Sequence, residues 1–319
     1  MDTRPRGRPL HGSSAAPPVS APDVSPSADS AVEPGTLYVV ATPIGNLGDI
    51  THRAITVLRD ASLVVAEDTR HSRTLLSHYG ITTPMSSYHE HNEAREAPRL
   101  VARLAAGESI ALVTDAGTPL VSDPGARLVR AAVDGGIPVV PIPGASALLA
   151  ALVGAAIPAE RFTFVGFLAR KGRERDTELA SIARSPYTVV LYESPHRVGA
   201  TLGDLARAGC AERDAVIARE LTKRYEEFRR GTVQSLAAAI GDSELRGEVV
   251  IVIAGLPAPA QETSEEMARA EAQRLLADGN SPRTVVQQLS EALGVPRNVA
   301  YRLAHERPDG AAAEGGADD

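Results

Sequence analysis

The stretch Leu37-Tyr-Val-Val-Ala-Thr-Pro-Ile-Gly-Asn-Leu-Gly-Asp-Ile50 decides the fold, because a β-branched apolar run passes directly into a glycine-bearing turn. Its first five residues predict a buried strand. Gly45 and Gly48 permit positive φ or close approach to a ligand, and we expect Asp49 to cap a helix that begins near Thr51. The turn lacks the dinucleotide fingerprint and the phosphate loop, so nucleotide phosphate is not the favoured ligand, and a plain tight turn explains it equally well.

Two further segments repeat this transition from strand to loop. Residues 110–114 predict a buried strand that enters a glycine-rich loop, after which Asp123 and Pro124 predict a helix start and Gly135 its end. Residues 139–147 again join a short strand, a Pro-Gly turn and a helix of small residues. Three such loops in one half of the chain predict a single shared ligand pocket.

An ordered set of motifs along the chain is highly specific as a set. The motifs are Thr42-Pro-Ile-Gly-Asn-Leu-Gly-Asp49, Glu67-Asp-Thr-Arg70, Asp115-Ala-Gly-Thr-Pro119, Ser122-Asp-Pro-Gly125, Pro143-Gly-Ala-Ser-Ala147, Leu191-Tyr-Glu-Ser-Pro-His-Arg197, Ala218-Arg-Glu-Leu-Thr-Lys223 and Gly247-Glu-Val-Val-Ile-Val-Ile253. Together they resemble the ribosomal RNA small subunit methyltransferase I family, a branch of the tetrapyrrole methylase superfamily. The resemblance covers residues 36–306.

This resemblance implies an activity and its partners. The methyl donor would be S-adenosylmethionine, and the acceptor the ribose 2'-hydroxyl of a decoding-centre cytidine (cytidine 1402) in 16S ribosomal RNA of the 30S subunit. A homodimer is also implied. The alternative is a methyltransferase for a tetrapyrrole of precorrin or uroporphyrinogen type, which would share the architecture and the cofactor. A nonenzymatic RNA-binding factor is a second alternative, although the glycine loops are intact.

The predicted fold class is α/β, with two α/β domains of tetrapyrrole-methylase type, the cofactor in the cleft between them, and a small C-terminal helical unit. We expect Phe162–Phe167 to be the last strand of the first domain. The end segments are rich in Pro, Ser and Ala or very short of apolar residues, which predicts disorder. The predicted boundaries are a disordered extension at 1–35, domains at 36–167 and 168–257, a helix-turn-helix-like unit at 258–306 and a disordered tail at 307–319.

Composition sets independent bounds on the class of protein. A chain of 319 residues with 43% hydrophobic content can form two ordinary cores, and 3% aromatic content makes those cores aliphatic. A single cysteine, Cys210, excludes an intramolecular disulfide and a cysteine-based zinc site, which fits a cytoplasmic location. The longest apolar stretch is too short to span a bilayer, so no membrane association is expected.

The charge balance requires that any RNA contact come from local patches, since the formal net charge is −7. Cations are concentrated at 170–175 and 219–230, which favours RNA contact by these two clusters. The ordinary alternative for such charged runs is a solvated face. In the C-terminal unit, Arg297, Asn298 and Arg302 would either contact nucleic acid or belong to a helical bundle, with equal weight. The RNA-binding candidates are Arg70, His89, Asn92, Arg170, Lys171, Arg197, Arg219 and Lys223.

The resemblance also assigns cofactor-binding residues. These are Pro43, Ala116, Gly117, Thr118, Val121, Ser146, Ala147, Glu193 and Ala218. Asp115 is added because it would either favour the positive charge of the cofactor or fix its own turn. Methyl transfer is an in-line displacement in which alignment supplies much of the rate, and a general base would assist the ribose hydroxyl. The candidate bases, which sequence does not rank, are Glu67, Asp68, Glu90, Glu193 and Glu220; Arg70 would form a structural ion pair with one of them.

The segment Tyr88-His-Glu-His-Asn-Glu93 alternates histidines with acids and invites comparison with a metal site. Further ligands at matching spacing are missing, so we expect no metal. The favoured interpretation is a substrate-facing loop in which Tyr88 or His89 stacks on a base and Asn92 bonds to a base edge.

Overall fold

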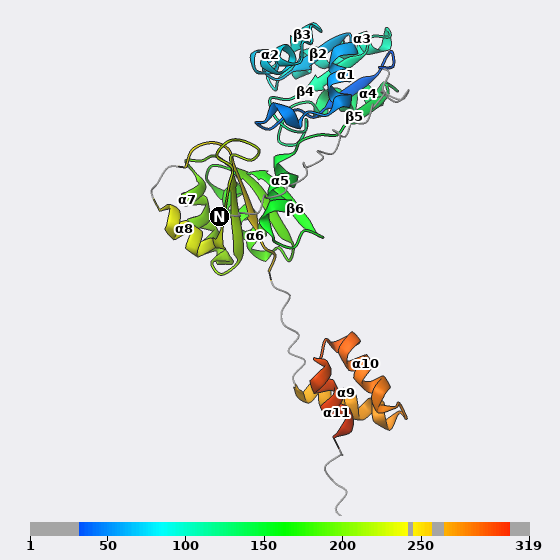
Figure 1. Cartoon of the computed structure of the whole chain (residues 1–319), viewed down its shortest axis with the longest axis vertical. Coiled ribbons are helices and arrows are strands. Elements are labelled where there is room, and N and C mark those ends of the chain that lie inside the picture. The colour runs from blue at the N-terminus through cyan, green and yellow to red at the C-terminus, as the bar shows by residue number, and fades with distance from the viewer. Residues whose placement is uncertain (1–31, 242–244, 257–264, 307–319) are drawn as a thin grey trace, which may run out of the picture. The chain divides into compact units, whose positions relative to one another are not determined.

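The computed structural model describes residues 32–241, 245–256 and 265–306 (Figure 1). Within it the chain divides into two compact units: the first ends at Gly144, and the second comprises the remainder together with the short segment Ile44–Asn46. Most of the predicted disorder, at residues 1–31 and 307–319, lies outside the described residues. Residues 32–35, also predicted to be disordered, instead lead into the first strand through a turn.

The first unit contains a five-stranded sheet in which every strand is parallel to its neighbours. The strand order is β3-β2-β4-β1-β5. The strands are β1 (Leu37–Val40), β2 (Leu63–Ala66), β3 (Met85–Ser87), β4 (Ile110–Val113) and β5 (Val139–Ile142). Strands β2 and β4 are buried along their whole length, as expected for a parallel sheet covered by helices on both faces. The predicted parallel sheet is therefore confirmed.

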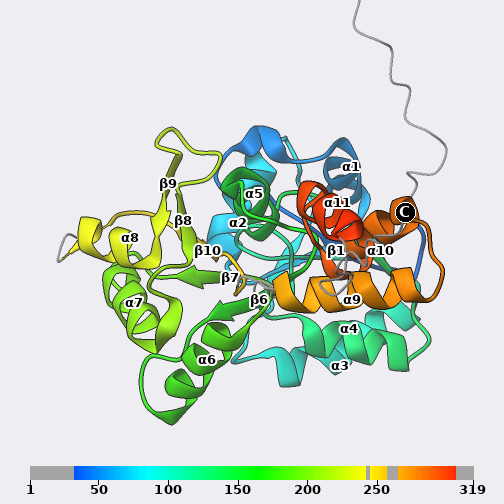
Figure 2. The same cartoon turned by 90° about the horizontal axis from the view of Figure 1, so that it is seen from below.

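Successive strand residues of the first unit enter two separate cores. In β4, Ala111 and Val113 pack with α1 (His52–Asp60) and α2 (Thr69–His78). Ile110 and Leu112 pack with α3 (Glu93–Ala105) and α4 (Ala126–Asp134), which lie side by side (Figure 2). The chain therefore leaves β1 toward one face of the sheet and leaves β4, its neighbour, toward the other. Such a switch point is where open α/β sheets bind ligands.

Two predicted helix caps in the first unit are wrong. Thr51, not Asp49, caps α1, because its side chain accepts a hydrogen bond from the Ala54 amide, whereas Asp49 ends a short 3-10 helix (Leu47–Asp49). Helix α4 begins after Gly125 rather than at the Asp123-Pro124 pair. In both cases the N-cap lies two residues further along the chain than predicted, which local residue preferences do not reveal. The predicted end of α4 at Gly135 is confirmed.

The second unit has a mixed sheet in the order β6-β7-β10-β8-β9. Its strands are β6 (Phe162–Phe167), β7 (Thr188–Glu193), β8 (Asp214–Arg219), β9 (Glu227–Thr232) and β10 (Val249–Ile253). Strand β6 runs parallel to β7, and every other pair is antiparallel. The assignment of β6 as the last strand of the first domain is therefore wrong, and the first unit ends at Gly144 rather than at 167. Pairing with β7, not the composition of β6, decides which sheet it joins.

Helices cover both faces of the second sheet. Apolar side chains of α6 (Arg173–Arg184), α7 (Val198–Leu205), the π-helical turn Ala206–Cys210 and α8 (Val233–Ile240) form one core. Helix α5 (Ala147–Ala155) lies on the other face with Ile44. The ends of the central strands β7, β10 and β8 form two opposite sides of this sheet. We call the side with the paired residues Glu193, Val249 and Arg219 the motif edge, and the side with Val189 and Ile253 the opposite edge.

The C-terminal helices form a small body with its own core, as the sequence predicts. They are α9 (Glu265–Ala277), α10 (Pro282–Leu293) and α11 (Arg297–His305). Ser281 caps α10 and Gly294 ends it in the left-handed conformation, while Val285 and Leu289 pack inward. Among the described residues, no helix combines the length and apolar character needed to cross a membrane.

Candidate active site

The loops that follow β1 and β4 are joined at the switch point of the first sheet. Thr42 N–H donates to the Gly117 carbonyl (2.8 Å) and Gly117 N–H donates to the Thr42 carbonyl (3.0 Å). The Thr42 hydroxyl also donates to the Thr114 carbonyl (3.3 Å). The two predicted ligand loops are therefore joined to each other by backbone hydrogen bonds. Gly144, after β5, lies so close that an added Cβ would sit 3.0 Å from Ala41 Cβ, which brings the third loop beside them.

The loop after β4 is held in an unusual backbone conformation. Gly117 has φ +81°, and the non-glycine residues Leu120 and Ser122 have φ +71° and +67°. Left-handed conformations are costly for residues with a side chain and persist where the surrounding structure enforces them, often at functional sites. Ala116 is exposed, and Thr118 and Val121 are partly exposed. A ligand can therefore reach the backbone of this loop.

Three carboxylates surround Thr114 at the same edge: Glu67 after β2, Asp115 after β4, and Asp123. The Thr114 hydroxyl donates to Glu67 Oε2 (3.2 Å). Burial, reinforced by the charge of Asp115, raises the pKa of Glu67. Burial and the charges of Glu67 and Asp115 raise the pKa of Asp123 to about 6. The raised pKa values of Glu67 and Asp123 suit a general base.

Asp115 also has a positioning role that the sequence does not predict. Its Oδ1 accepts a hydrogen bond from the Asp68 backbone amide (3.0 Å), so it holds the loop after β2. Within the described residues, no Lys or Arg forms an ion pair with Glu67, Asp115 or Asp123. The cluster is thus anionic, and the charge of Arg70 acts on Asp115 without an ion pair between them.

Asp68 is a helix cap and is not suited to act as a base. It accepts from the Arg70 amide (2.8 Å) at the start of α2 and forms an ion pair with the Arg70 guanidinium (2.6 Å). These interactions with Arg70 hold the pKa of Asp68 well below its usual range. The predicted ion pair of Arg70 is present, and the Arg70 side chain is still 89% exposed, so it remains an RNA-binding candidate.

Two side chains of the segment 88–93, Tyr88 and Asn92, are buried and stabilise the fold instead of facing a substrate. Tyr88 is buried in the first unit's core, and burial raises its pKa to about 12, so it does not stack on a base. Asn92 is also buried: its Oδ1 accepts from the His89 amide (2.9 Å) and its Nδ2 donates to the Ser87 carbonyl (3.0 Å). Its predicted role at a base edge is therefore wrong. His89 is partly exposed and remains an RNA-binding candidate. Glu90 is exposed.

Glu193 of the second unit is a buried structural carboxylate. It accepts from the Thr201 hydroxyl (2.6 Å) and the Ser194 amide (2.8 Å), and Arg197 lies 3.5 Å away. Arg197 also donates to the Leu168 and Ala169 carbonyls. Glu193 is 2% exposed, so its side chain does not supply a base, and Arg197 is engaged in holding this loop rather than free for RNA.

Two cations near the end of β8, Arg219 and Lys223, are paired with acids. Arg219 pairs with Glu227 (3.0 Å), and Lys223 pairs with Glu220 (2.9 Å) and Glu248 (3.0 Å). The hydrogen bond from Lys223 lowers the pKa of Glu220, which makes Glu220 a weak base. Gly45 leaves space for Lys223, since an added Cβ would lie 2.5 Å from its Cγ. Ala218 is buried within β8.

In the predicted cluster at 170–175, Arg170 and Lys171 are exposed, whereas Arg175 is buried. Arg175 pairs with Asp204 (2.6 Å) and donates to the Thr201 hydroxyl (3.0 Å). Its expected contribution to an RNA patch is therefore wrong.

Ser146 caps α5, because its hydroxyl oxygen accepts a hydrogen bond from the Leu149 amide (3.5 Å), and Ala147 begins that helix. Asp123 and Thr114 were missed, because no local pattern places them beside Glu67.

Comparison with known proteins identifies the fold and the family of the chain. Residues 36–237 match the family described as Tetrapyrrole (Corrin/Porphyrin) Methylases. Among solved structures, uroporphyrin-III C-methyl transferase from Thermus thermophilus, complexed with S-adenyl homocysteine, gives a TM-score of 0.51 at 21% identity, over 69% of this chain and 97% of that one. The methyltransferase CobJ gives 0.53 at 19% identity, over 69% and 94%. The fold is thus that of the tetrapyrrole methylases.

Two curated relatives define the branch. The ribosomal RNA small subunit methyltransferase I of Synechocystis is 48% identical over 85% of this chain and 98% of the relative. Its counterpart in Pseudomonas aeruginosa is 46% identical over 86% and 98%. The chain belongs to the ribosomal RNA small subunit methyltransferase I family, as the motifs indicate.

Proposed function

We propose that this chain transfers a methyl group from S-adenosylmethionine to the ribose 2'-hydroxyl of a decoding-centre cytidine, cytidine 1402, in 16S ribosomal RNA. The observation that carries the proposal is the carboxylate cluster of Glu67, Asp115 and Asp123 beside the joined loops after β1 and β4. Family membership supplies the general reaction, and the cluster supplies a proton acceptor for the hydroxyl group.

The residues of this edge fit the cofactor. S-adenosylmethionine carries a sulfonium cation, and the cluster is anionic with no Lys or Arg paired to it in the described residues. Ala116, Thr118 and Val121 are at least partly exposed in this loop, and the buried Gly117 fixes its backbone through the bridge to Thr42. When bound, the cofactor supplies an activated methyl group. The chain itself orients the reacting groups and accepts the proton.

Glu67 and Asp123 are the proposed acceptors of the ribose proton. Their raised pKa values place protonation nearer to neutral pH than for ordinary carboxyl groups. Asp68 and Glu220 have lowered pKa values, and Glu193 is engaged by neighbouring donors. Among the acids proposed from the sequence, Glu67 is thus the best placed. Asp115 positions the loop after β2.

A tetrapyrrole substrate is less well supported. Precorrin-type rings carry several carboxylates, and an anionic edge would repel them unless bound cations intervened. The solved tetrapyrrole methyltransferases share the fold with this chain at 19–21% identity, which does not extend to the substrate.

A transfer assay tests the proposal. Labelled S-adenosylmethionine is offered with 30S subunits that lack ribose methylation, with naked 16S ribosomal RNA and with a precorrin, and labelled nucleotides are then mapped. We expect label on the cytidine ribose. Label on the precorrin alone, or on a base instead of a ribose, would overturn the proposal.

A further inference from the structure

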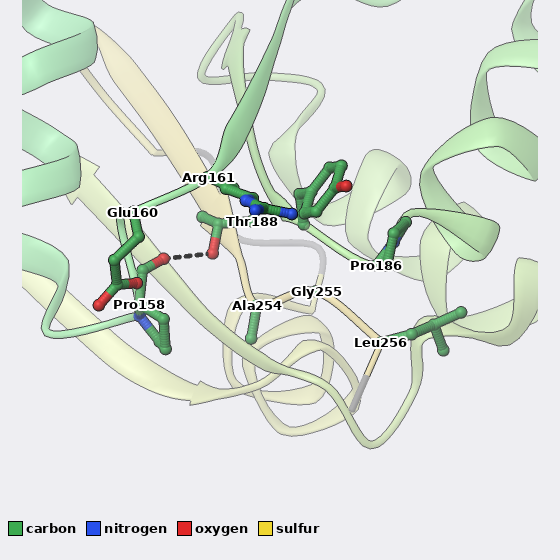
Figure 3. Close-up of a pocket in the computed structure, with 9 residues that line it drawn as sticks. Pro158, Glu160, Arg161, Pro186, Thr188, Ala254, Gly255 and Leu256 are labelled. Carbon is green, nitrogen blue, oxygen red and sulfur yellow. Dashed lines mark hydrogen bonds between the residues drawn. The ribbon is translucent and has the colours of Figure 1, made fainter. Parts of the chain in front are cut away.

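A pocket lies in the second unit at the edge of the sheet opposite the motif edge. It is lined by the segments that precede β6 and β7 and by the residues that follow β10, and its volume is about 340 Å³ (Figure 3). Glu193 and Thr188 mark the two ends of β7, which are about 17 Å apart for an extended strand. The pocket is therefore separate from the motif residues of this unit, and none of its lining residues has a part in the proposed reaction.

The walls of the pocket combine an aromatic face, a cation and an acid. The Arg161 guanidinium lies over the Tyr187 ring, 5.8 Å from its centroid. Tyr187 is 41% exposed although it is a large apolar residue, and Leu256 is 40% exposed. Glu160 adds a carboxylate at the rim (Figure 3). An exposed ring beside a guanidinium is the arrangement on which unpaired bases stack.

The floor of the pocket is fixed in shape. The buried Thr188 hydroxyl donates to the Pro158 carbonyl (2.5 Å), which ties the start of β7 to the chain before β6. Leu256 N–H donates to the Ser185 carbonyl (2.8 Å), which holds the third wall. The volume lies at the small end of the range for ligand pockets, about 300–1,000 Å³. It suits one nucleotide and is too small for a macrocycle.

The cations around the pocket are available for a ligand. Within the described residues, Arg161 and Arg184 form no ion pair, as is also true of other exposed arginines of this unit such as Arg170 and Arg173. Arg161 lines the pocket, and Arg184 ends α6 two residues before Pro186 of the pocket wall. Unpaired guanidinium groups beside an exposed aromatic ring suit the phosphate and the base of one nucleotide.

We infer that this pocket binds an unpaired nucleotide of the ribosomal RNA substrate outside the methylated position, an inference that rests on the proposed function. The base stacks on Tyr187, Arg161 contacts its phosphate, and Glu160 accepts a hydrogen bond from a base amino group or a ribose hydroxyl. The pocket thereby contributes affinity and register for the RNA and takes no part in the chemistry.

Steady-state methylation of unmethylated 30S subunits tests this role. Tyr187→Ala is expected to raise KM for the subunits about tenfold, in line with the usual contribution of one stacked base, with kcat and the KM for S-adenosylmethionine unchanged. Tyr187→Phe keeps the ring and should behave as the unaltered enzyme. Arg161→Gln should raise the same KM and weaken its salt dependence. Arg207→Gln is the matched control, since it removes one exposed guanidinium elsewhere in the unit.

A photo-reactive phenylalanine analogue in place of Tyr187 identifies the occupant. Irradiation with 30S subunits should attach a nucleotide of 16S ribosomal RNA to the pocket peptide. Attachment to a ribosomal protein instead, or a Tyr187→Ala enzyme with unchanged KM, would overturn the inference. If the unaltered enzyme methylates no RNA at all, the proposed function fails first and the inference fails with it.

Discussion

Thr42 and Gly117 exchange two backbone hydrogen bonds, of 2.8 and 3.0 Å, across the carboxyl ends of β1 and β4. The bridge joins two loops that lie more than seventy residues apart in the chain and that leave the sheet toward opposite faces. A switch point in a parallel sheet opens a crevice by its topology. Here the bridge holds the two loops together and fixes the carbonyl and amide groups of Thr42 and Gly117.

Gly117→Ala should weaken cofactor binding. Gly117 has φ +81°, a conformation that costs a residue with a side chain about 1–2 kcal/mol. If the loop shifts to relieve this strain, the bridge to Thr42 is distorted, and we expect the Kd for S-adenosylmethionine to rise about tenfold in calorimetry. Gly107→Ala is the control, because Gly107 also has positive φ but nothing lies within 4 Å of its added Cβ. Equal effects of both substitutions on the Kd would contradict the prediction.

Glu67→Gln and Asp123→Asn should each reduce kcat by about 10²–10⁴-fold if the carboxylate cluster accepts the ribose proton. The base must be deprotonated, and the pKa of Asp123 is raised to about 6 by burial and by its acidic neighbours. Activity of the unaltered enzyme should therefore fall as the pH drops through about 6. Asp68→Asn should change kcat little, since Asp68 is a cap engaged by Arg70. A pH–rate profile in single turnover checks all three variants, and a flat profile from pH 5 to 8 would refute the role.

Asp123→Asn should also stabilise the protein at neutral pH. A carboxyl group whose folded pKa is raised binds its proton more tightly when folded, so its contribution is most favourable below the unfolded value near 3.8 and is lost as pH rises through about 6. Removing the charge should then raise the free energy of unfolding at pH 7.5 by on the order of 1 kcal/mol, after allowance for solvent screening. Urea unfolding at pH 4 and 7.5 measures the difference. No gain at pH 7.5 would argue against a buried charge at this position.

The sequence predicts several strands and the end of α4 correctly because their signals are local. The apolar run of β4 and the helix end at Gly135 are each specified by a few adjacent residues. The assignment of β6 failed because sheet membership depends on a partner far along the chain, as in the pairing of Phe164 with Val190. Local preferences do not contain that information.

Part of the candidate site was predictable because its motifs are local in the sequence. Family motifs identified the loop after β4, and Glu67 was among the proposed bases. The importance of Asp123 depends on burial and on the charges of Glu67 and Asp115, which the fold alone brings together. Arg175 was misassigned because a run of cations does not show which member turns inward to meet Asp204.

Arg175→Gln should destabilise the second unit. It removes a buried guanidinium that pairs with Asp204 and makes two further hydrogen bonds, which should cost about 2–4 kcal/mol at about 1–3 kcal/mol per buried group that loses a partner. Asp204 keeps its pair with Arg207. Arg207→Gln provides a sharp control, since Arg207 pairs with the same Asp204 but is 74% exposed and should cost less than about 1 kcal/mol. Denaturant unfolding of the two variants measures both values. Similar losses would show that burial does not distinguish the two arginines.

Arg170→Gln and Lys171→Gln should weaken RNA binding without loss of stability. Both side chains are exposed in the loop between β6 and α6, whereas Arg219 and Lys223 near the end of β8 are paired with acids. Removing one phosphate contact should reduce the slope of log K against log salt by about 0.7–0.9. Binding of unmethylated 30S subunits over a salt series measures that slope. The control is Arg130→Gln, which removes an exposed cation that pairs with Asp134 in the first unit and should leave the slope unchanged. If all three variants keep the original slope, Arg170 and Lys171 belong to a solvated face, and the RNA must be held by other cations.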